Sequence, residues 1–324
     1  VSERVSLPIE QRGDAQLSGG IPGILKEAID RAMKKYIEHD HIKKFGPPRE
    51  VYAIVGAPWT RARTVYSESV FPEPRAITNA MIQSLAQEAI KQPADIDLQS
   101  LLETSVVRVH VNRYPTGKPI GKRGTHLAVT VYQSGIEPSI LSSIQTAVGA
   151  GFPGRRLVLR SRTRAILHVL KERALNEHCL IVSVGTESME CIALRKDEIT
   201  EHATIPEGET SIIKRVAGEK GLPEESTSLL RMLASDTCAV PQCEELKAGL
   251  ARAEPEMMKI FGETFGTLAA VRKLPNKCVL FAHADYAPWL EHFFGRLDFA
   301  PFTITTQPFV VESITPEHLR ESAL

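Results

Sequence analysis

The sequence predicts an α/β protein of two lobes, with a smaller α/β subdomain inserted in the first lobe. Two observations support this fold class. Short apolar runs rich in Val and Ile alternate along the chain with longer segments that repeat apolar residues at helical spacing. The chain also has 324 residues and 43% hydrophobic content, which is enough for about two domains with buried cores.

The first lobe is expected to begin with a strand and a helix. Residues 1–8 alternate as a strand, and residues 21–36 repeat apolar side chains at helical spacing. Pro22 lies in the first turn of that helix, where proline is tolerated. The apolar run at 50–56 then predicts a buried strand.

The next part of the chain predicts the inserted subdomain. Thr78 is a good helix N-cap, and the apolar residues after it recur at helical spacing. Residues 113–123, RYPTGKPIGKR, are rich in Gly, Pro and charge and predict a loop between two strands. We therefore expect, in order, a strand at 63–71, a helix at 77–90, strands at 105–112 and 126–133, and a helix at 138–148.

The remaining chain predicts the second lobe. In Leu180–Leu194, LIVSVGTESMECIAL, two apolar runs flank a tight loop, and this pattern predicts a buried hairpin. A strand at 156–161 and a helix at 163–171 are expected before it. After it we expect, in order, a strand at 198–205, helices at 211–219, 224–234 and from 242 into the 260s, and a strand, turn and helix over 279–290.

The hairpin loop is a candidate phosphate-binding site. Gly185 would let the backbone approach an anion, and Thr186 and Ser188 would add hydroxyl donors on either side of Glu187. A plain buried turn has the same composition, because Gly and Ser suit many turns. The loop alone therefore leaves both interpretations open.

The order of hairpin, helices, strand, small-residue turn and helix is that of the second half of an actin-like ATPase, and here the chain resembles the bacterial FtsA and PilM proteins. Its inserted unit has the element order of theirs, and Lys118-Pro119-Ile120-Gly121-Lys122 is similar to their Pro-x-Gly segment. The resemblance covers nearly the whole chain. It implies an actin-like (ribonuclease H-like) fold, with a first lobe at 1–56 and 151–177, the inserted subdomain at 57–150, and a second lobe at 178–324.

The same resemblance implies a nucleotide site whose motifs are degenerate in this chain. The family has a metal-directing Asp where this chain has Ser183, and a Gly-Gly-Gly turn against the adenosine where it has Ala282-His283-Ala284. The family also has a Gly-Gly pair before a later helix, and this chain keeps only one of the two glycines, Gly208. We also expect the family's first Asp-x-Gly phosphate loop to be missing, because none precedes residues 1–8. ATP and Mg are therefore expected to bind weakly.

Composition and charge exclude some classes of function. Lys plus Arg and Asp plus Glu are both 39, so no overall attraction to nucleic acid or acidic lipid follows, and any basic contact must be local. No apolar run approaches the ~20 residues that span a bilayer, and we expect no signal peptide. The five cysteines lack CxxC spacing and predict reduced, buried thiols of a cytosolic protein: Cys179, Cys191, Cys238, Cys243 and Cys278.

Other polar groups have ordinary structural explanations. His283 beside Asp285 predicts a hydrogen-bonded turn, because no nucleophile accompanies the pair. His110 and His126 lie on two predicted strands but lack a third metal ligand. Arg12-Gly13-Asp14 predicts a polar turn. No catalytic residue and no metal site are assigned.

The basic loop of the inserted subdomain is a candidate partner-binding surface. Such a loop is usually a solvated tip, yet loops on a rigid scaffold are also where partners dock. Its cationic side chains are Arg113, Lys118, Lys122 and Arg123.

The resemblance implies a cytoplasmic scaffold of the FtsA/PilM type, in bacterial cell division or type IV pilus assembly, with little or no nucleotide hydrolysis. Its partners would be proteins of that complex and further copies of itself, with no nucleic acid and with the membrane reached only through partners. Residues 315–324 predict about one turn of helix, too short for an interfacial anchor. Two alternatives stay open: an active ATPase whose first phosphate loop lies upstream of residue 1, and a sugar-kinase-like enzyme, which would need a catalytic Asp.

Overall fold

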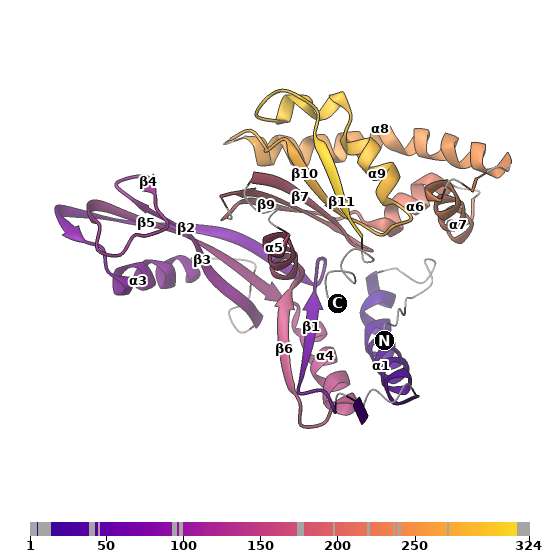
Figure 1. Ribbon diagram of the computed structural model, residues 1–324, viewed down its shortest axis with the longest axis horizontal. Helices are drawn as coiled ribbons and strands as arrows, with labels where there is room; N and C mark the ends of the chain where they lie inside the picture. The colour runs from indigo at the N-terminus through magenta and orange to yellow at the C-terminus, as the bar shows by residue number, and fades with distance from the viewer. Residues whose placement is uncertain are drawn as a thin grey trace. The chain divides into compact units, whose positions relative to one another are not determined.

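The computed structural model divides the chain into two compact units (Figure 1). Unit 1 comprises residues 1–61, 94–103 and 134–165, and unit 2 comprises residues 62–93, 104–133 and 166–324. The structure describes residues 5, 14–38, 43–44, 46–92, 96, 100–173, 178–196, 198–218, 221–235, 237–238, 241–270 and 272–315. The predicted strand at 1–8, Arg12-Gly13 and the predicted turn after residue 315 lie outside this description, apart from Val5.

Unit 1 is built on two parallel strands. β1 (Glu50–Val55) pairs with β6 (Arg156–Ser161), so that Val51 lies opposite Leu157. The helices α1 (Asp14–Glu38) and α4 (Pro138–Gly151) pack on one face of this pair. The buried side chains of that core are Val55, Ile136, Ile140, Ile144 and Val148.

A four-stranded sheet carries most of the predicted inserted subdomain. Its strands stand in the order β2-β5-β3-β4, and α3 covers one face. The Thr78 hydroxyl caps α3 by accepting a hydrogen bond from the Met81 amide, as the sequence predicts. The bounds are β2 (Thr60–Ala76), α3 (Asn79–Ile90), β3 (Leu101–Val111), β4 (Tyr114–Pro115) and β5 (Arg123–Ile136).

Unit 2 also contains a five-stranded mixed sheet in the order β11-β10-β7-β8-β9. β8 runs antiparallel to β7 and β9, whereas β10 runs parallel to both β7 and β11. α5 (Arg162–Glu172) contributes Ile166 and Leu170 to the core on one face. The bounds are β7 (His178–Val184), β8 (Met189–Arg195), β9 (Glu198–Ile205), β10 (Lys277–Phe281) and β11 (Val310–Ile314).

Helices lie over the opposite face of this sheet (Figure 1). They are α6 (Glu209–Ala217), α7 (Pro223–Ala234), α8 (Pro241–Ala269), α9 (Ala287–Phe294) and the 3-10 helix η3 (Leu297–Phe302). Their buried core is a group of phenylalanine rings in edge contact, with Phe261 and Phe294 centroids 4.8 Å apart. Each helix and strand predicted within the described residues is present, while β4, η3 and β11 were not predicted.

Candidate functional site

The structure brings the two nucleotide-site segments that the sequence predicts to one edge of the five-stranded sheet. β7 and β10 are parallel neighbours, and Ser183 lies opposite Phe281 in their register. Because parallel strands end at the same edge, the Gly185–Ser188 loop and the Ala282–Ala284 turn follow the strands at that edge.

The hairpin loop is joined to the start of α6 by backbone hydrogen bonds. The Gly185 amide donates to the Ser188 carbonyl at 2.9 Å and closes the turn. The Glu209 and Thr210 amides donate to the carbonyls of Gly185 and Thr186, each at 2.9 Å. The first amides of α6, which in a helix are free to bind an anion, are therefore bonded to the loop.

Gly208 permits this close join. A Cβ built on it would lie 2.4 Å from the Thr186 carbonyl oxygen, a backbone atom that cannot turn away. The Gly208 amide is itself bonded to the Ser211 hydroxyl at 2.8 Å. The glycine that the sequence assigns to the site therefore serves packing between the loop and α6.

Acidic side chains lie around the loop. The Glu187 carboxylate accepts a hydrogen bond from the Thr210 hydroxyl at 2.8 Å. Glu207, directly before Gly208, forms a two-bond ion pair with Arg215, and these hydrogen bonds lower the pKa of Glu207. Glu187 therefore adds negative charge to the loop, whereas Arg215 balances the charge of Glu207.

Glu190 is a buried acidic residue that sequence reasoning missed. It lies directly opposite Ser183 in the β7–β8 pair, and its Oε1 is 3.6 Å from His202 Nε2 of β9. Both side chains are buried. The Ser188 hydroxyl at the end of the same loop is also buried, with no hydrogen-bond partner among the described residues. The available signal was one charge inside the otherwise apolar run MECIAL.

The Ala282–Ala284 turn is held by its own hydrogen bonds. The His283 carbonyl accepts from the Tyr286 and Ala287 amides, each at 3.0 Å, and His283 Nδ1 accepts from the Asp285 amide at 3.3 Å. The Asp285 carboxylate pairs with Arg231 of α7 at 3.2 Å. His283 and Asp285 are thus both engaged in the turn and in its link to α7.

Two charged residues of α7 have different surroundings. Glu225 lines a cavity of 370 Å³ between α6, α7 and α8, together with Val216, Leu222, Glu245 and Arg252. Arg231 instead forms the ion pair with Asp285. The two residues therefore have different neighbours.

The residues at this edge fit a nucleoside triphosphate poorly. The α6 amides and the Gly185 amide are already bonded within the protein. The Glu187 carboxylate lies in the loop and Glu190 lies opposite Ser183, which cannot replace an anionic metal ligand. Phosphate charge would therefore meet few donors and the carboxylate of Glu187.

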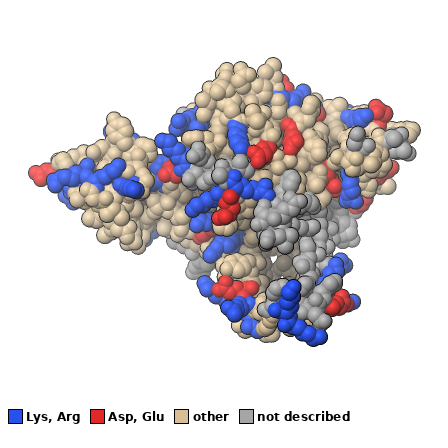
Figure 2. All heavy atoms as spheres, in the orientation of Figure 1, with Lys and Arg blue, Asp and Glu red and all other residues tan. Residues whose placement is uncertain are grey.

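The four basic residues of the predicted contact loop lie at one end of the four-stranded sheet. Arg113 occupies the turn between β3 and β4 with φ 69°, and Lys118 and Lys122 lie in the loop between β4 and β5. Arg123, at the start of β5, donates to the Pro74 carbonyl at 2.9 Å. Figure 2 shows Lys and Arg side chains gathered on this subdomain, with an acidic group at its far end.

His110 and His126 lie on neighbouring strands of the same sheet. His126 Nε2 is 3.0 Å from Glu68 of β2, and burial together with the nearby Arg108 lowers the pKa of His110. Among the described residues no group of three His, Cys, Asp or Glu side chains could hold a metal ion.

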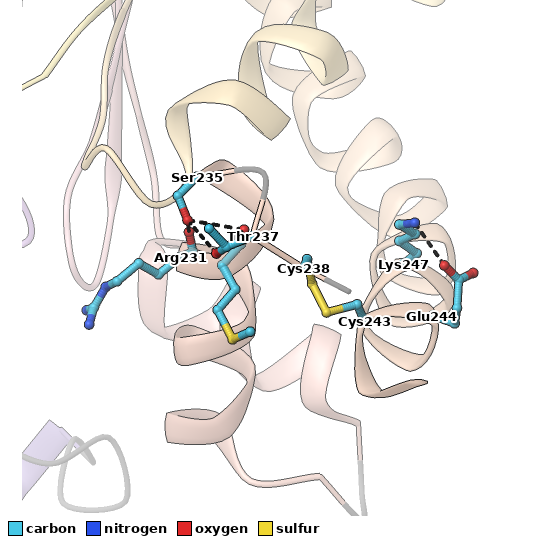
Figure 3. Close-up of a disulfide and its surroundings, with 8 residues drawn as sticks. Arg231, Ser235, Thr237, Cys238, Cys243, Glu244 and Lys247 are labelled. Atoms are coloured by element: carbon cyan, nitrogen blue, oxygen red, sulfur yellow. Dashed lines mark hydrogen bonds and ion pairs between the residues drawn. A yellow bond between two sulfur atoms is a disulfide. The ribbon is translucent and has the colours of Figure 1, made fainter. Parts of the chain in front are cut away.

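The prediction of five free thiols is wrong for two cysteines. Cys238 and Cys243 form a disulfide with a Cα–Cα distance of 6.0 Å, at the connection between α7 and α8 (Figure 3). The spacing is not CxxC, and Cys243 lies in the first turn of α8, five residues after Cys238. The remaining cysteines, Cys179, Cys191 and Cys278, are free and buried, and burial raises the pKa of Cys179 and Cys191 to about 12.

Comparison with known proteins identifies the fold. No protein-family model matches the chain, and no curated protein sequence matches it. A chain of the PilM-PilN type IV pilus biogenesis complex is similar in structure, with a TM-score of 0.55 at 14% identity over 93% of this chain and 75% of that chain. The chain has the actin-like fold.

Two other solved structures are more distant. The ethanolamine utilization protein EutJ from Carboxydothermus hydrogenoformans has a TM-score of 0.37 at 16% identity, over 54% of this chain and 57% of that chain. A Bacteroides thetaiotaomicron protein with an actin-like ATPase fold and unknown function has a TM-score of 0.35 at 7% identity, over 90% of this chain and 79% of that chain. Within the described residues of this chain, no helix combines the length and apolar character needed to cross a bilayer.

Proposed function

We propose that this chain is an actin-like scaffold of the FtsA/PilM type that works without nucleotide hydrolysis. The observation that carries the proposal is the direct bonding of the hairpin loop to α6. Amides of Gly185, Glu209 and Thr210 are all engaged by protein carbonyls. A fold that keeps its architecture while bonding its phosphate donors internally suits a structural role better than a catalytic one.

The complex served would be a pilus assembly or a division complex. The likeness to a chain of the PilM-PilN complex supports the pilus role, and protein partners of such a complex are the expected contacts. We assign the contact surface to the inserted subdomain at 57–150, with Arg113, Lys118, Lys122 and Arg123 as its contact residues. These side chains are exposed, so they are available for binding. Self-association is part of the same proposal.

Calorimetry with Mg-ATP tests the nucleotide part of this proposal. We expect a dissociation constant weaker than about 1 mM, which corresponds to only ~4 kcal/mol of binding. The matched control is Gly185→Ala, which should leave the weak signal unchanged if the loop holds no nucleotide. A micromolar constant, or steady phosphate release abolished by Gly185→Ala, would defeat the scaffold proposal.

One observation favours the active ATPase as a second candidate. Among the described residues β1 has a neighbour on one edge only, and its Tyr52 and Ile54 side chains are exposed. Parallel strands are normally covered on both faces. Further strands carrying a first phosphate loop would pair with the open edge of β1, and micromolar ATP binding by a chain extended before residue 1 would support that candidate.

A further inference from the structure

Residues 112–123 of the inserted subdomain form a surface that we call the basic tip. It consists of the β3–β4 turn, β4 and the loop to β5. The segment around it, residues 104–133, contains no Asp or Glu. Its cationic residues are Arg108, Arg113, Lys118, Lys122 and Arg123.

Part of the positive charge of the basic tip has no acidic partner among the described residues, although Arg113 is close enough to Glu68 of β2 to interact with its carboxylate. Arg108 pairs with Glu198 of β9 and is not part of the tip. Lys118 and Lys122 have no ion pair with any residue that the structure describes, and Arg123 is bonded to a neutral carbonyl. A protein of zero formal net charge thus concentrates cations at one local surface.

Two large apolar side chains stand among these cations. Tyr114 is 76% exposed and Ile120 is 65% exposed. Tyr114 lies in β4 and Ile120 lies in the loop between β4 and β5, a segment that curls out from the sheet (Figure 1). Exposed aliphatic and aromatic residues beside Lys and Arg are the composition of surfaces that enter the headgroup region of a bilayer.

The basic tip is held in shape by backbone hydrogen bonds. The Ile77 amide donates to the Lys122 carbonyl at 2.8 Å, and the Gly121 amide donates to the Ile77 carbonyl at 2.9 Å. The Asn112 amide donates to the His126 carbonyl at 2.8 Å. Because the turns are fixed, Tyr114 and Ile120 are presented without a large ordering cost on binding.

We propose that the basic tip binds an anionic lipid bilayer directly. The inference rests on the proposed function, in which the predicted inserted subdomain carries the contact surface of the scaffold, and it replaces the protein partner proposed there for this surface with a lipid surface. Lys118, Lys122, Arg113 and Arg123 bind the anionic headgroups, while Ile120 and Tyr114 enter the interface. Projecting apolar side chains favour a lipid surface over an acidic protein, since a protein partner would leave them in water unless it supplied a matching pocket.

Binding to anionic vesicles should depend on the number of cationic side chains and on the salt concentration. Each Lys or Arg near an anionic surface strengthens partition by about fivefold. Reversing three charges should therefore weaken it by at least about 100-fold. High salt should weaken it as well, because the Debye length falls from about 10 Å at 0.1 M to about 3 Å at 1 M.

The experiment is vesicle co-sedimentation of the whole chain. Vesicles of phosphatidylcholine alone are compared with vesicles of equal phosphatidylcholine and phosphatidylglycerol, at low and high salt. We expect binding only to the mixed vesicles, loss of binding in the triple variant K118E/K122E/R123E, and a several-fold loss in Ile120→Ser. The matched control K26E/K34E/K259E reverses three exposed lysines on α1 and α8 and should keep most of the binding.

Three results would overturn the proposal. They are no binding of the unmodified chain to mixed vesicles, equal loss in the control variant, and binding of a labelled polyglutamate peptide at the tip without vesicle binding. The last result would assign the tip to an acidic protein. None of them bears on the calorimetric test with Mg-ATP, so failure of the lipid proposal and failure of the scaffold proposal can be told apart.

Discussion

Each unit contains a pair of parallel strands, and the two pairs differ in how they are covered. In unit 2, β10 lies between β7 and β11, and Cys278, Val279, Leu280 and Phe281 are all buried. In unit 1, β1 pairs only with β6 among the described residues. Tyr52 and Ile54 of β1 are 62% and 59% exposed.

The difference indicates how much stability a parallel strand gains when both faces of its sheet are packed. The unit 2 sheet is packed by α5 on one face and by the phenylalanine cluster of α8, α9 and η3 on the other. The unit 1 pair is packed by α1 and α4 on one face. Buried apolar area is the main source of stability. We therefore expect β1 to be held less tightly than β10.

The largest loss of stability is expected when a buried side chain of β10, the strand covered on both faces, is shortened. Leu280→Ala removes a fully buried side chain from β10, and it should lower the free energy of unfolding of unit 2 by about 2–5 kcal/mol. The measurement is hydrogen exchange followed by mass spectrometry, because a chain of two units need not unfold in one step. A loss below about 1 kcal/mol would mean that the β10 core is loosely packed.

A smaller effect is expected at the edge of the same sheet. Ser183→Asp places a carboxylate in a buried position opposite Glu190, where burial and the like charge both disfavour ionisation. The variant should be destabilised by about 2–4 kcal/mol at neutral pH. Ser183→Ala is the control and should cost little.

The pH dependence of Ser183→Asp follows from the sign of the shift. The new carboxyl would have a folded pKa raised above its unfolded value, so the folded state binds more protons. The penalty is therefore absent below the unfolded pKa and grows as pH rises toward the folded pKa. Stabilisation of the variant by Mg and ATP together would instead reveal an intact metal site.

The sequence predicts the helices and strands of the two units better than the pairings and contacts between distant segments. The Leu180–Leu194 hairpin and the Thr78 cap follow from local pattern, since both depend on residues close in the chain. β11 was missed because it is a short segment whose strand character depends on pairing with β10, more than 30 residues earlier in the chain. β4 is only a two-residue strand.

The candidate site shows the same limit. The sequence identifies Gly185, Thr186 and Gly208 as candidate phosphate-site residues, but not that Thr186 and Gly208 would be packed against each other. The role of Glu190 depends on His202, which reaches it from a separate strand. The disulfide of Cys238 and Cys243 depends on the turn between two helices. Contacts between elements, rather than the elements, decide what the site can bind.

The smallest expected effect is at the exposed face of β1. Ile54→Ala is the counterpart of Leu280→Ala. Ile54 is the second-last residue of β1, and Leu280 is the second-last residue of β10. Each of these strands pairs in parallel with an edge strand, β6 or β11. Since Ile54 is 59% exposed, we expect a change within about 0.5 kcal/mol in the exchange-derived stability of unit 1. The measurement is repeated at two protein concentrations. A loss above about 1.5 kcal/mol would mean that this face is covered in solution, and a loss that appears only at the higher concentration would assign the cover to a second copy of the chain, because association stabilises by mass action.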